Sequence, residues 1–461
     1  MTRLPGFLLL LATVAGHAAD LRLPDYERVE LANGTVLLLS EKHEVPLIGL
    51  RAAIRGGAVA DPAGKEGLAQ LYADVIRKGA GRRDAAAFAE AAAAVGGRIS
   101  AAADRESLTI GAEFLSRDAE LMLGLVTDML RRPALAADEF EKERARSIDR
   151  LKSAKDADPS GLMAPYADAF LYGAHPYGNA ASGSESSLAA IEHDDLTSFF
   201  EEQVGGDRLV VAVVGDFETG AMKARLTSVF ESWRPAAAPL PQLAEPVRTS
   251  GRRVLLVDKP GATQTYFWIG NLSVALDYPR RAELDIANTL FGGRFTSMLM
   301  TVLRVEHGLT YGAGSRVVRH TRSGSATIRS FTGTASTVEA VDLAIDTLGR
   351  LHTEGVDDEM IASARNYLMG QFPPTLETAA NLAEKISFLE LNGFDRSYVD
   401  EYGAELEAAT PVTVRSAIGD VYPAADDLAI VLIGDASAVR EAVQKYGPVT
   451  EMSITAPRFR P

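Results

Sequence analysis

Cysteine is absent from the 461-residue sequence, which excludes disulfide bonds, cysteine nucleophiles and cysteine-based metal sites. Basic residues are outnumbered by acidic ones: the chain has 47 lysines and arginines and 62 aspartates and glutamates, which gives a formal net charge of −15. An acidic chain repels nucleic acid phosphates and anionic lipid surfaces, so neither is an expected partner. The hydrophobic fraction of 47 % is ordinary for a globular protein that buries real cores.

The sequence also lacks an apolar run long enough to span a bilayer as a helix. The run near the start, Phe7–Ala15, is too short for this. Arg3 precedes this run and small residues follow it at Gly16 and Ala18, as in a secretory signal peptide. We therefore predict that residues 1–19 are a signal peptide and that the mature chain is periplasmic, with no membrane span. An uncleaved N-terminal anchor is the alternative.

Two patterns occur twice in the chain. Thr35–Ile54 and Arg253–Leu272 both have the alternating, β-branched composition of two strands joined by a polar turn. Leu209–Thr219 has a counterpart of similar sequence at Leu428–Ala438. Both pairs are separated by about 220 residues, which is far above the period of solenoid repeats and indicates an internal duplication.

The segment between the two copies, Arg234–Gly251, contains four prolines. Proline forbids regular helix and favours an extended tether. We therefore expect a linker at residues 235–250 between an N-terminal domain, residues 20–234, and a C-terminal domain, residues 251–461. Two similar domains on such a tether can fold toward each other and enclose a space.

Helices and strands are expected in separate runs within each copy. Asp84–Gly97 is alanine-rich and predicts a helix that ends at a glycine pair, and Ile99–Leu115 predicts two strands. Ser116–Pro133 and Ala137–Asp156 then have the apolar spacing of amphipathic helices. Segregated runs of this kind predict an α+β fold with a largely antiparallel sheet.

Three segments together resemble a known family: Arg55–Gln70, His175–Phe217 and Arg294–Ser315. They are similar to the insulinase/pitrilysin-type metallopeptidases, which carry an inverted His-x-x-Glu-His zinc motif, and above all to the short bacterial branch that is similar to the mitochondrial processing peptidase. The resemblance extends in order over nearly the whole mature chain. It implies two homologous α/β-sandwich domains, mostly antiparallel sheet plus helices, that form half of a clamshell.

The resemblance also implies where the zinc site should be. The first zinc histidine of the family falls on Gln70, the catalytic glutamate on Ala73 and the second histidine on Asp74. The third ligand follows a Glu-Arg pair that matches Glu143–Arg144, and it falls on Arg150. Zinc needs two ligands at i and i+4 on one helix face, and its water needs a carboxylate base. We therefore expect no metal in this chain.

Asp74 and Arg150 are opposite charges at positions that zinc would bridge. We expect them to form an ion pair that replaces the metal as a link between two helices. The alternative is that both side chains point to water, and a register shift of one residue would place Asp149 there instead.

The second domain keeps an arginine and a tyrosine, Arg304 and Tyr311, seven residues apart. The resemblance implies that this pair reaches across the chamber to a peptide held at the zinc. Tyrosine is a neutral O–H donor at working pH, and arginine is a permanent cation that can bind a peptide carbonyl. The alternative is structural: Arg304 caps a helix C-terminus and Tyr311 packs in a strand.

Gly96–Ser107 matches the region where family members present an edge strand, here Ser100, Ala101 and Ala102. An open edge can pair with an extended peptide through backbone hydrogen bonds. An ordinary internal strand is the alternative, because edge and interior strands share propensities.

The chain thus keeps the residues that assist catalysis and lacks those that hold zinc, which resembles the two-subunit members of the family. This predicts a non-zinc-binding subunit of a periplasmic heterodimeric zinc endopeptidase, with zinc in a homologous partner and peptide as the substrate. The alternatives are a catalytically inert scaffold or peptide-binding protein, and an independent zinc peptidase with different ligands. The sequence leaves open the peptide specificity, the partner's identity and whether a homodimer forms.

Overall fold

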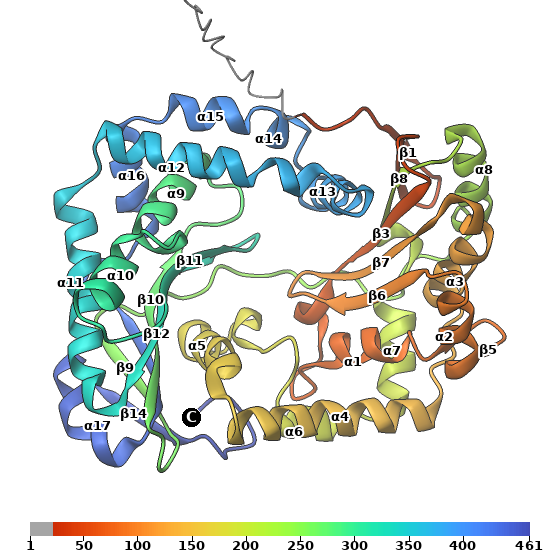
Figure 1. Cartoon of the computed structure of the whole chain (residues 1–461). Helices are drawn as coiled ribbons and strands as arrows, with labels where there is room; N and C mark the ends of the chain where they lie inside the picture. The colour runs from red at the N-terminus through yellow and green to blue at the C-terminus, as the bar shows by residue number, and fades with distance from the viewer. Residues whose placement is uncertain (1–21) are drawn as a thin grey trace, which may run out of the picture.

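The computed structural model describes residues 22–461, so the predicted signal peptide lies outside the described residues. Two six-stranded sheets, each covered by helices, form the two sides of the molecule (Figure 1). Most strand pairs are antiparallel, and each sheet also contains parallel pairing. The expected α+β class with two sandwich-like units is confirmed.

The first sheet has the strand order β1-β2-β8-β3-β7-β6. Its strands are β1 (Glu27–Glu30), β2 (Val36–Glu41), β3 (Leu47–Arg55), β6 (Arg98–Ala103), β7 (Ser107–Leu115) and β8 (Leu209–Gly215). The two strands predicted within Thr35–Ile54 are β2 and β3, which are not neighbours in the sheet. The strand β8 lies between them, parallel to β2 and antiparallel to β3.

The second sheet repeats this arrangement with the order β11-β12-β10-β13-β9-β14. Its strands are β9 (Arg253–Asp258), β10 (Gln264–Ser273), β11 (Ala313–Arg319), β12 (Gly324–Gly333), β13 (Ala429–Gly434) and β14 (Val449–Ser453). The strand β13 lies between β9 and β10, parallel to β9 and antiparallel to β10. The two sheets share the order of five strands, as a duplicated chain produces. They differ at one edge, where β1 is antiparallel to β2 and β14 is parallel to β9.

Helices connect and cover the strands. In the first copy they are α1 (Leu68–Val75), α2 (Ala85–Ala93), α3 (Ala119–Arg131), α4 (Ala137–Asp156), α5 (Met163–Tyr172), α6 (Glu185–Ala190), α7 (His193–Gln203) and α8 (Thr219–Phe230). In the second copy they are α9 (Arg281–Asn288), α10 (Met298–Met300), α11 (Thr337–Glu354), α12 (Asp358–Gln371), α13 (Ala379–Asn392), α14 (Ser397–Asp400), α15 (Tyr402–Ala408), α16 (Pro411–Val421) and α17 (Ala436–Val443). Residues 235–252 form neither helix nor strand.

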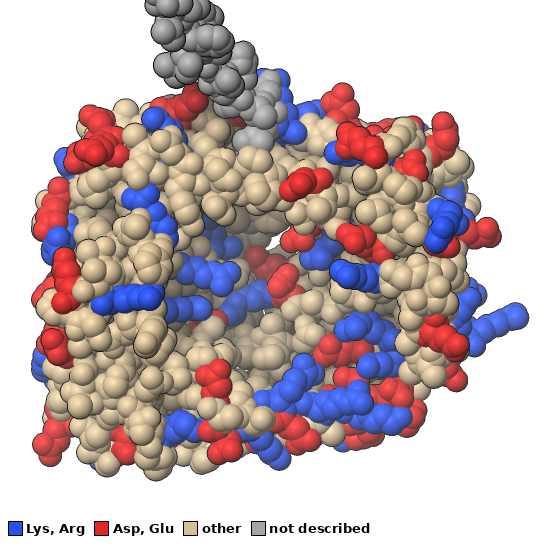
Figure 2. Space-filling model, viewed as in Figure 1, with Lys and Arg blue, Asp and Glu red and all other residues tan. Residues whose placement is uncertain are grey.

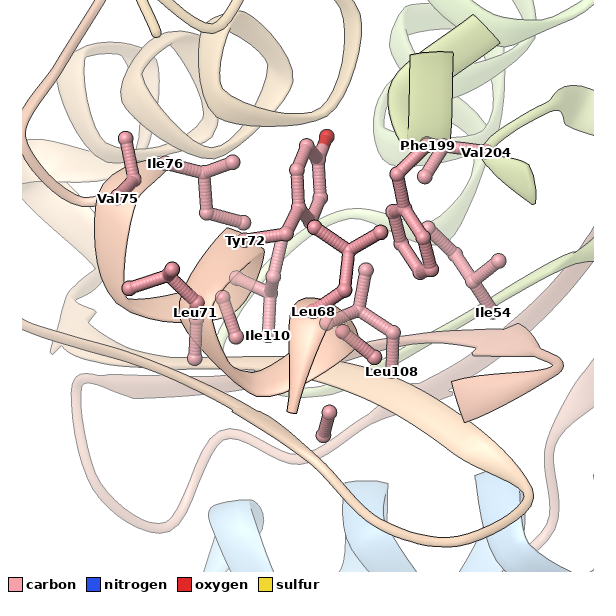
Figure 3. Packing of buried hydrophobic residues seen from close by; sticks show 14 of the residues in the cluster. Ile54, Leu68, Leu71, Tyr72, Val75, Ile76, Leu108, Ile110, Phe199 and Val204 are labelled. Carbon is pink, nitrogen blue, oxygen red and sulfur yellow. The ribbon is translucent and has the colours of Figure 1, made fainter. Parts of the chain in front are cut away.

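The helix α1 is held by a continuous apolar face. Leu68, Leu71, Tyr72 and Val75 are buried and pack toward the strands β3 and β7 and the helix α7 (Figure 3). The ring of Tyr72 contacts that of Phe199 at a centroid distance of 5.1 Å. This packing fixes which side of α1 remains free to face α4 and β6.

Two helices pack against the sheet of the other copy. The helix α5 packs on β10 and β13, and α13 packs on β3 and β8, as Figure 1 shows. The contact with α13 forms an apolar cluster of its own, in which Leu382 and Ile386 meet Val36, Leu38 and Val210. The packing therefore crosses the boundary between the two expected domains. Among the described residues, no helix is long and apolar enough to cross a membrane.

Candidate functional site

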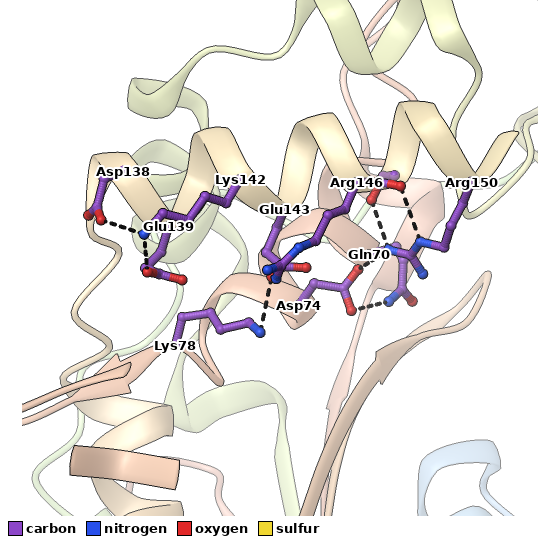
Figure 4. Close-up of polar contacts among 10 residues, drawn as sticks. Gln70, Asp74, Lys78, Asp138, Glu139, Lys142, Glu143, Arg146 and Arg150 are labelled. Atoms are coloured by element: carbon purple, nitrogen blue, oxygen red, sulfur yellow. Dashed lines mark hydrogen bonds and ion pairs between the residues drawn. The ribbon is translucent and has the colours of Figure 1, made fainter. Parts of the chain in front are cut away.

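The helix α1 presents Gln70 and Asp74 on one face, one turn apart, toward α4 and β6 (Figure 4). The Oε1 atom of Gln70 accepts a hydrogen bond from the backbone N–H of Ala103 at 2.9 Å. Its Nε2 donates to the Asp74 carboxylate at 3.2 Å. Both ends of the amide are thus engaged, and Gln70 links α1 to the end of β6.

Ala73 comes three residues after Gln70 on α1, so it borders this polar face. It is fully buried within the main apolar cluster of the first copy. A methyl group in this position contributes packing and cannot accept a proton, so the helix offers no general base here.

Arg150, on α4, reaches the same polar face. Its Nη2 atom lies 3.7 Å from an Asp74 carboxylate oxygen, within ion-pair range but beyond a hydrogen bond. The Arg150 side chain is 67 % exposed, and it also donates to the Ser147 hydroxyl at 3.1 Å. Arg150 therefore occupies the place opposite Asp74, as expected from the sequence, in a loose pair that water screens.

The sequence did not predict a stronger link, which joins α4 to the turn that follows α1. Glu143 is buried, and one of its carboxylate oxygens lies 3.0 Å from the Lys78 ammonium and also contacts Arg146. Burial favours the neutral acid, but the hydrogen bonds and charges of Lys78 and Arg146 outweigh it and lower the pKa of Glu143. Lys78 lies in the turn after α1, which ends at Val75, so the helical spacing of the sequence did not point to this contact.

The residues at the expected metal position do not fit zinc. The amide oxygen of Gln70 is already bonded to Ala103, Asp74 is a lone carboxylate, and Arg150 places a cation where a dication would bind. Burial raises the pKa of Asp74, with the Gln70 hydrogen bond and the Arg150 charge opposing it. In the described part of the chain, no group of three or more His, Cys, Asp or Glu side chains is placed to hold a metal.

Arg304 and Tyr311 lie close together in the second copy. Arg304 is in the last turn of the π-helical segment η7 (Thr301–Glu306), and Gly308 ends that segment with a φ of +64° that favours glycine. The Arg304 guanidinium lies 5.7 Å from the centroid of the Tyr311 ring and 4.7 Å from that of Phe295. The three side chains therefore form one cation–π cluster.

The Tyr311 side chain projects into solvent. Tyr311 is 83 % exposed and precedes the strand β11, so the alternative in which it packs within a strand is wrong. Among the described residues, neither its hydroxyl nor the Arg304 guanidinium has a hydrogen-bond partner. An unengaged O–H donor beside an unengaged guanidinium can bind the carbonyl oxygen of a ligand.

The strand β6 is the last strand of its sheet, so the internal-strand alternative is also wrong. Because Ala103 directs its N–H away from β7, the alternation of antiparallel pairing also turns the backbone of Ala101 outward. Ser100 and Ala102 direct their backbone groups toward β7. Of the three expected edge residues, Ala101 alone offers its backbone to another strand.

The structure thus brings three of the expected zinc-site residues into contact and places the arginine–tyrosine pair elsewhere. Gln70, Asp74 and Arg150 meet, and Gln70 ties them to the end of the edge strand. No hydrogen bond or ion pair within residues 22–461 connects this group to Arg304 or Tyr311. The two groups lie on different copies of the duplicated fold.

Comparisons with known proteins agree with these features. Residues 36–183 match the family profile described as "Insulinase (Peptidase family M16)", and residues 190–368 match the one described as "Peptidase M16 inactive domain". An uncharacterized zinc protease of Mycobacterium leprae is 26 % identical over 75 % of this chain and 76 % of its own length. A Helicobacter pylori protein named "Non-peptidase homolog YmxG" is 25 % identical over 75 % of this chain and 79 % of its own.

A crystal structure from Pseudomonas fluorescens, titled as a peptidase M16 inactive domain, has the same fold. It superposes with a TM-score of 0.81 and 22 % identity, covering 89 % of this chain and 98 % of the other. The fold and the site together define a peptidase-like chain whose zinc-ligand positions hold other residues. The chain belongs to the insulinase family, peptidase family M16, and lacks the zinc motif of that family.

Proposed function

We propose that this chain is the non-zinc-binding subunit of a periplasmic heterodimeric zinc endopeptidase. It supplies Arg304 and Tyr311 to a homologous, zinc-bearing partner, where they bind the peptide and stabilise the transition state. The observation that carries the proposal is the exposed, unengaged Arg304–Tyr311 pair in a chain whose zinc positions hold non-ligands.

The chemistry of this pair suits an assisting role. A tyrosine hydroxyl and a guanidinium aimed at a developing oxyanion contribute about 3–4 kcal/mol each in known enzymes. Ala101 complements them, because its outward backbone can pair with an extended peptide without regard to sequence. Peptide alignment and charge stabilisation would then come from this chain, and bond cleavage from its partner.

Two further parts of the proposal rest on sequence patterns. The signal-peptide pattern of residues 1–19 supports export to the periplasm. The proline-rich segment at residues 235–250 supports a division into domains of residues 20–234 and 251–461. Cell fractionation of the tagged native protein tests the first part, and recovery in the cytoplasmic fraction would contradict it.

The co-catalytic role is tested by mixing this chain with its zinc-bearing homologue and measuring peptide cleavage. We expect little cleavage by either protein alone and efficient cleavage by the mixture. Tyr311→Phe should lower the turnover of the mixture by about 10²–10³-fold, as for the loss of one oxyanion donor, with assembly unchanged on gel filtration.

Tyr367→Phe is the matched control, since Tyr367 is also surface-exposed and lies on α12. It should leave turnover unchanged. Full turnover in the Tyr311→Phe mixture would remove the assisting role of Tyr311.

An inert scaffold or peptide-binding protein of the same fold is the second candidate. The Helicobacter pylori relative named as a non-peptidase homolog favours it. This function predicts peptide binding by the chain with no increase in cleavage in any mixture.

A further inference from the structure

Two cavities follow the inner side of the first sheet, next to the edge strand β6. They have volumes of about 630 and 730 Å³, and Arg51 and Glu384 line both, so the cavities adjoin. The first lies between α2, β6 and α13, and the second continues to the β6–β7 and β11–β12 loops. Figure 2 shows Lys and Arg atoms gathered in the hollow between the two sides of the molecule.

The charge of the cavity walls is opposite in sign to that of the whole chain. Seven arginines line the two cavities: Arg51, Arg55, Arg77, Arg98, Arg105, Arg319 and Arg322. Four acidic residues line them: Asp104, Glu106, Glu113 and Glu384. A wall that is basic inside a chain of net charge −15 attracts anions into the hollow.

Several of these arginines are not engaged by the protein. Within the described residues, the side chains of Arg51, Arg77 and Arg98 have no hydrogen bond or ion pair. By contrast, Arg105 is bound to Asp168, and Arg55 donates to a backbone carbonyl of α13 at 3.1 Å. In the described part of the chain, the side chains of Arg319 and Arg322 in the second cavity likewise have no hydrogen bond or ion pair, so unengaged guanidinium groups line both cavities.

Arg51 is directed toward the edge strand by a glycine. In the sheet register, Arg51 on β3 and Ser100 on β6 both oppose Gly111 on β7, so they share one face. A Cβ atom on Gly111 would lie 3.5 Å from the Arg51 Nη1 atom and 2.9 Å from the Ser100 Oγ atom. The missing side chain at Gly111 leaves room for the Arg51 guanidinium to lie over β7 beside β6.

The acidic residues do not cancel this charge. The Glu106 carboxylate accepts hydrogen bonds from the Tyr177 hydroxyl at 2.6 Å and from the Thr321 hydroxyl. It therefore links the first copy to the second. Glu113 and Glu384 form no ion pair with the arginines of the described chain, although both line the first cavity with them. Three guanidinium groups against two carboxylates leave that cavity basic.

We propose that these cavities bind the acidic side chains of an extended peptide, so that the chain selects acidic peptides. This inference rests on the peptide-binding role in the proposed function. A peptide paired with β6 sends alternate side chains to one face, about 7 Å apart. Carboxylates at alternate positions would meet Arg51, Arg98 and Arg77, and charge-assisted hydrogen bonds would form without loss of any internal pair.

The test measures binding by fluorescence anisotropy with this chain alone. The probes are a fluorescein-labelled ten-residue peptide with Glu at alternate positions and the same peptide with Gln in those positions. We expect the Glu peptide to bind at least about tenfold more tightly at low salt, the factor for one charge-assisted hydrogen bond, and the preference to shrink as salt rises.

Arg51→Gln combined with Arg98→Gln should bring the two affinities together. Arg350→Gln on the outer helix α11, where Arg350 pairs with Glu354, is the control and should keep the preference. Equal binding of both peptides to the native chain, no binding of either, or an unchanged preference in the double variant would overturn the inference. Cleavage by the mixture is a separate readout, so loss of selectivity with intact co-catalysis would refute only this inference.

Discussion

Asp74 and Glu143 show how differently two carboxylates between the same helices behave. Asp74 faces a mostly exposed arginine at 3.7 Å, whereas Glu143 is buried against Lys78 at 3.0 Å. An exposed pair contributes about 0–1 kcal/mol, while breaking a buried pair leaves an uncompensated charge. The contact of α4 with α1 and the turn that follows it therefore depends mainly on the buried Lys78–Glu143 pair.

Double-mutant cycles measured by urea unfolding test this ranking. The cycle of Asp74→Asn with Arg150→Gln should give a coupling energy below about 1 kcal/mol. The cycle of Lys78→Met with Glu143→Gln should give a clearly larger coupling, on the order of 2–3 kcal/mol. The reverse ranking would show that the Asp74–Arg150 pair is the main link.

His320 makes stability depend on pH at the junction of the two copies. It lies between the copies, with its ring 4.8 Å from that of Tyr177. Burial and the nearby Arg105 charge lower the pKa of His320 to about 4, with Glu106 opposing them. The unfolded chain, with a histidine pKa near 6.5, binds this proton more readily than the folded chain.

This contribution to the free energy of unfolding is complete above about pH 6.5 and is lost as the pH falls toward 4. Between pH 7 and pH 4.5, His320→Gln should therefore lose less stability than the native chain, by about 1–3 kcal/mol. Urea unfolding at several pH values measures this difference, and carboxylate effects common to both proteins cancel. Parallel pH curves for the two proteins would contradict the assignment.

At the scale of elements, the positions on α1 and α4 can be tested by rebuilding a metal site. Positions 70 and 74 share one face of α1, and position 150 on α4 faces it. The triple variant Gln70→His, Asp74→His, Arg150→Glu should therefore bind zinc tightly, because it sets two histidines at i and i+4 opposite a carboxylate.

Metal analysis after dialysis measures this, with the native chain as the comparison. We expect about one zinc per chain in the variant, the number that one tetrahedral site holds. A folded triple variant that binds no zinc would show that these positions do not correspond to the family's ligand set.

Many elements could be predicted from the sequence because their signals are local. The helix α4 spans Ala137–Asp156 as expected, and α2 begins after Asp84, whose carboxylate accepts from the Ala87 N–H at 2.9 Å. The strands of the two repeated segments also form where their alternation predicted, although in each sheet another strand lies between them. These features depend on residues a few positions apart, so a single sequence contains the information.

Other features depend on contacts between distant residues and could not be predicted. The arginine cavities combine β3, β6 and α13, and no local pattern marks Arg51 as a neighbour of Ser100. The contact of Gln70 with Ala103 likewise depends on how α1 packs beside β6. The resemblance to the family predicted which positions to compare, but the hydrogen-bond partners of those residues came from the tertiary structure.

At the scale of the molecule, the two copies are linked by an exchange of helices. The helix α13 covers the first sheet and α5 packs on the second, and these helices occupy corresponding places about 220 residues apart. One helix of each copy thus packs on the sheet of the other copy, and neither sheet is fully covered by helices of its own copy. Such reciprocal packing makes the two copies one cooperative unit.

This exchange predicts that the first copy cannot fold by itself. A fragment of residues 22–252 lacks α13, so it exposes the apolar face formed by Val36, Leu38 and Val210. Exposed apolar patches of this kind promote aggregation, and the fragment loses the burial that α13 provides. We expect it to aggregate or to lack a cooperative thermal transition, and co-expression with residues 253–461 to restore a soluble complex.

The same interface can be tested in the full chain with a single substitution. Ile386→Ala on α13 removes buried methyl groups from the first sheet's face and should cost about 2–4 kcal/mol of unfolding free energy. Because both copies share this interface, probes in each copy should report one transition at the lowered midpoint. Two separate transitions, or a monomeric fragment of residues 22–252 as stable as the full chain, would mean that the copies are independent domains.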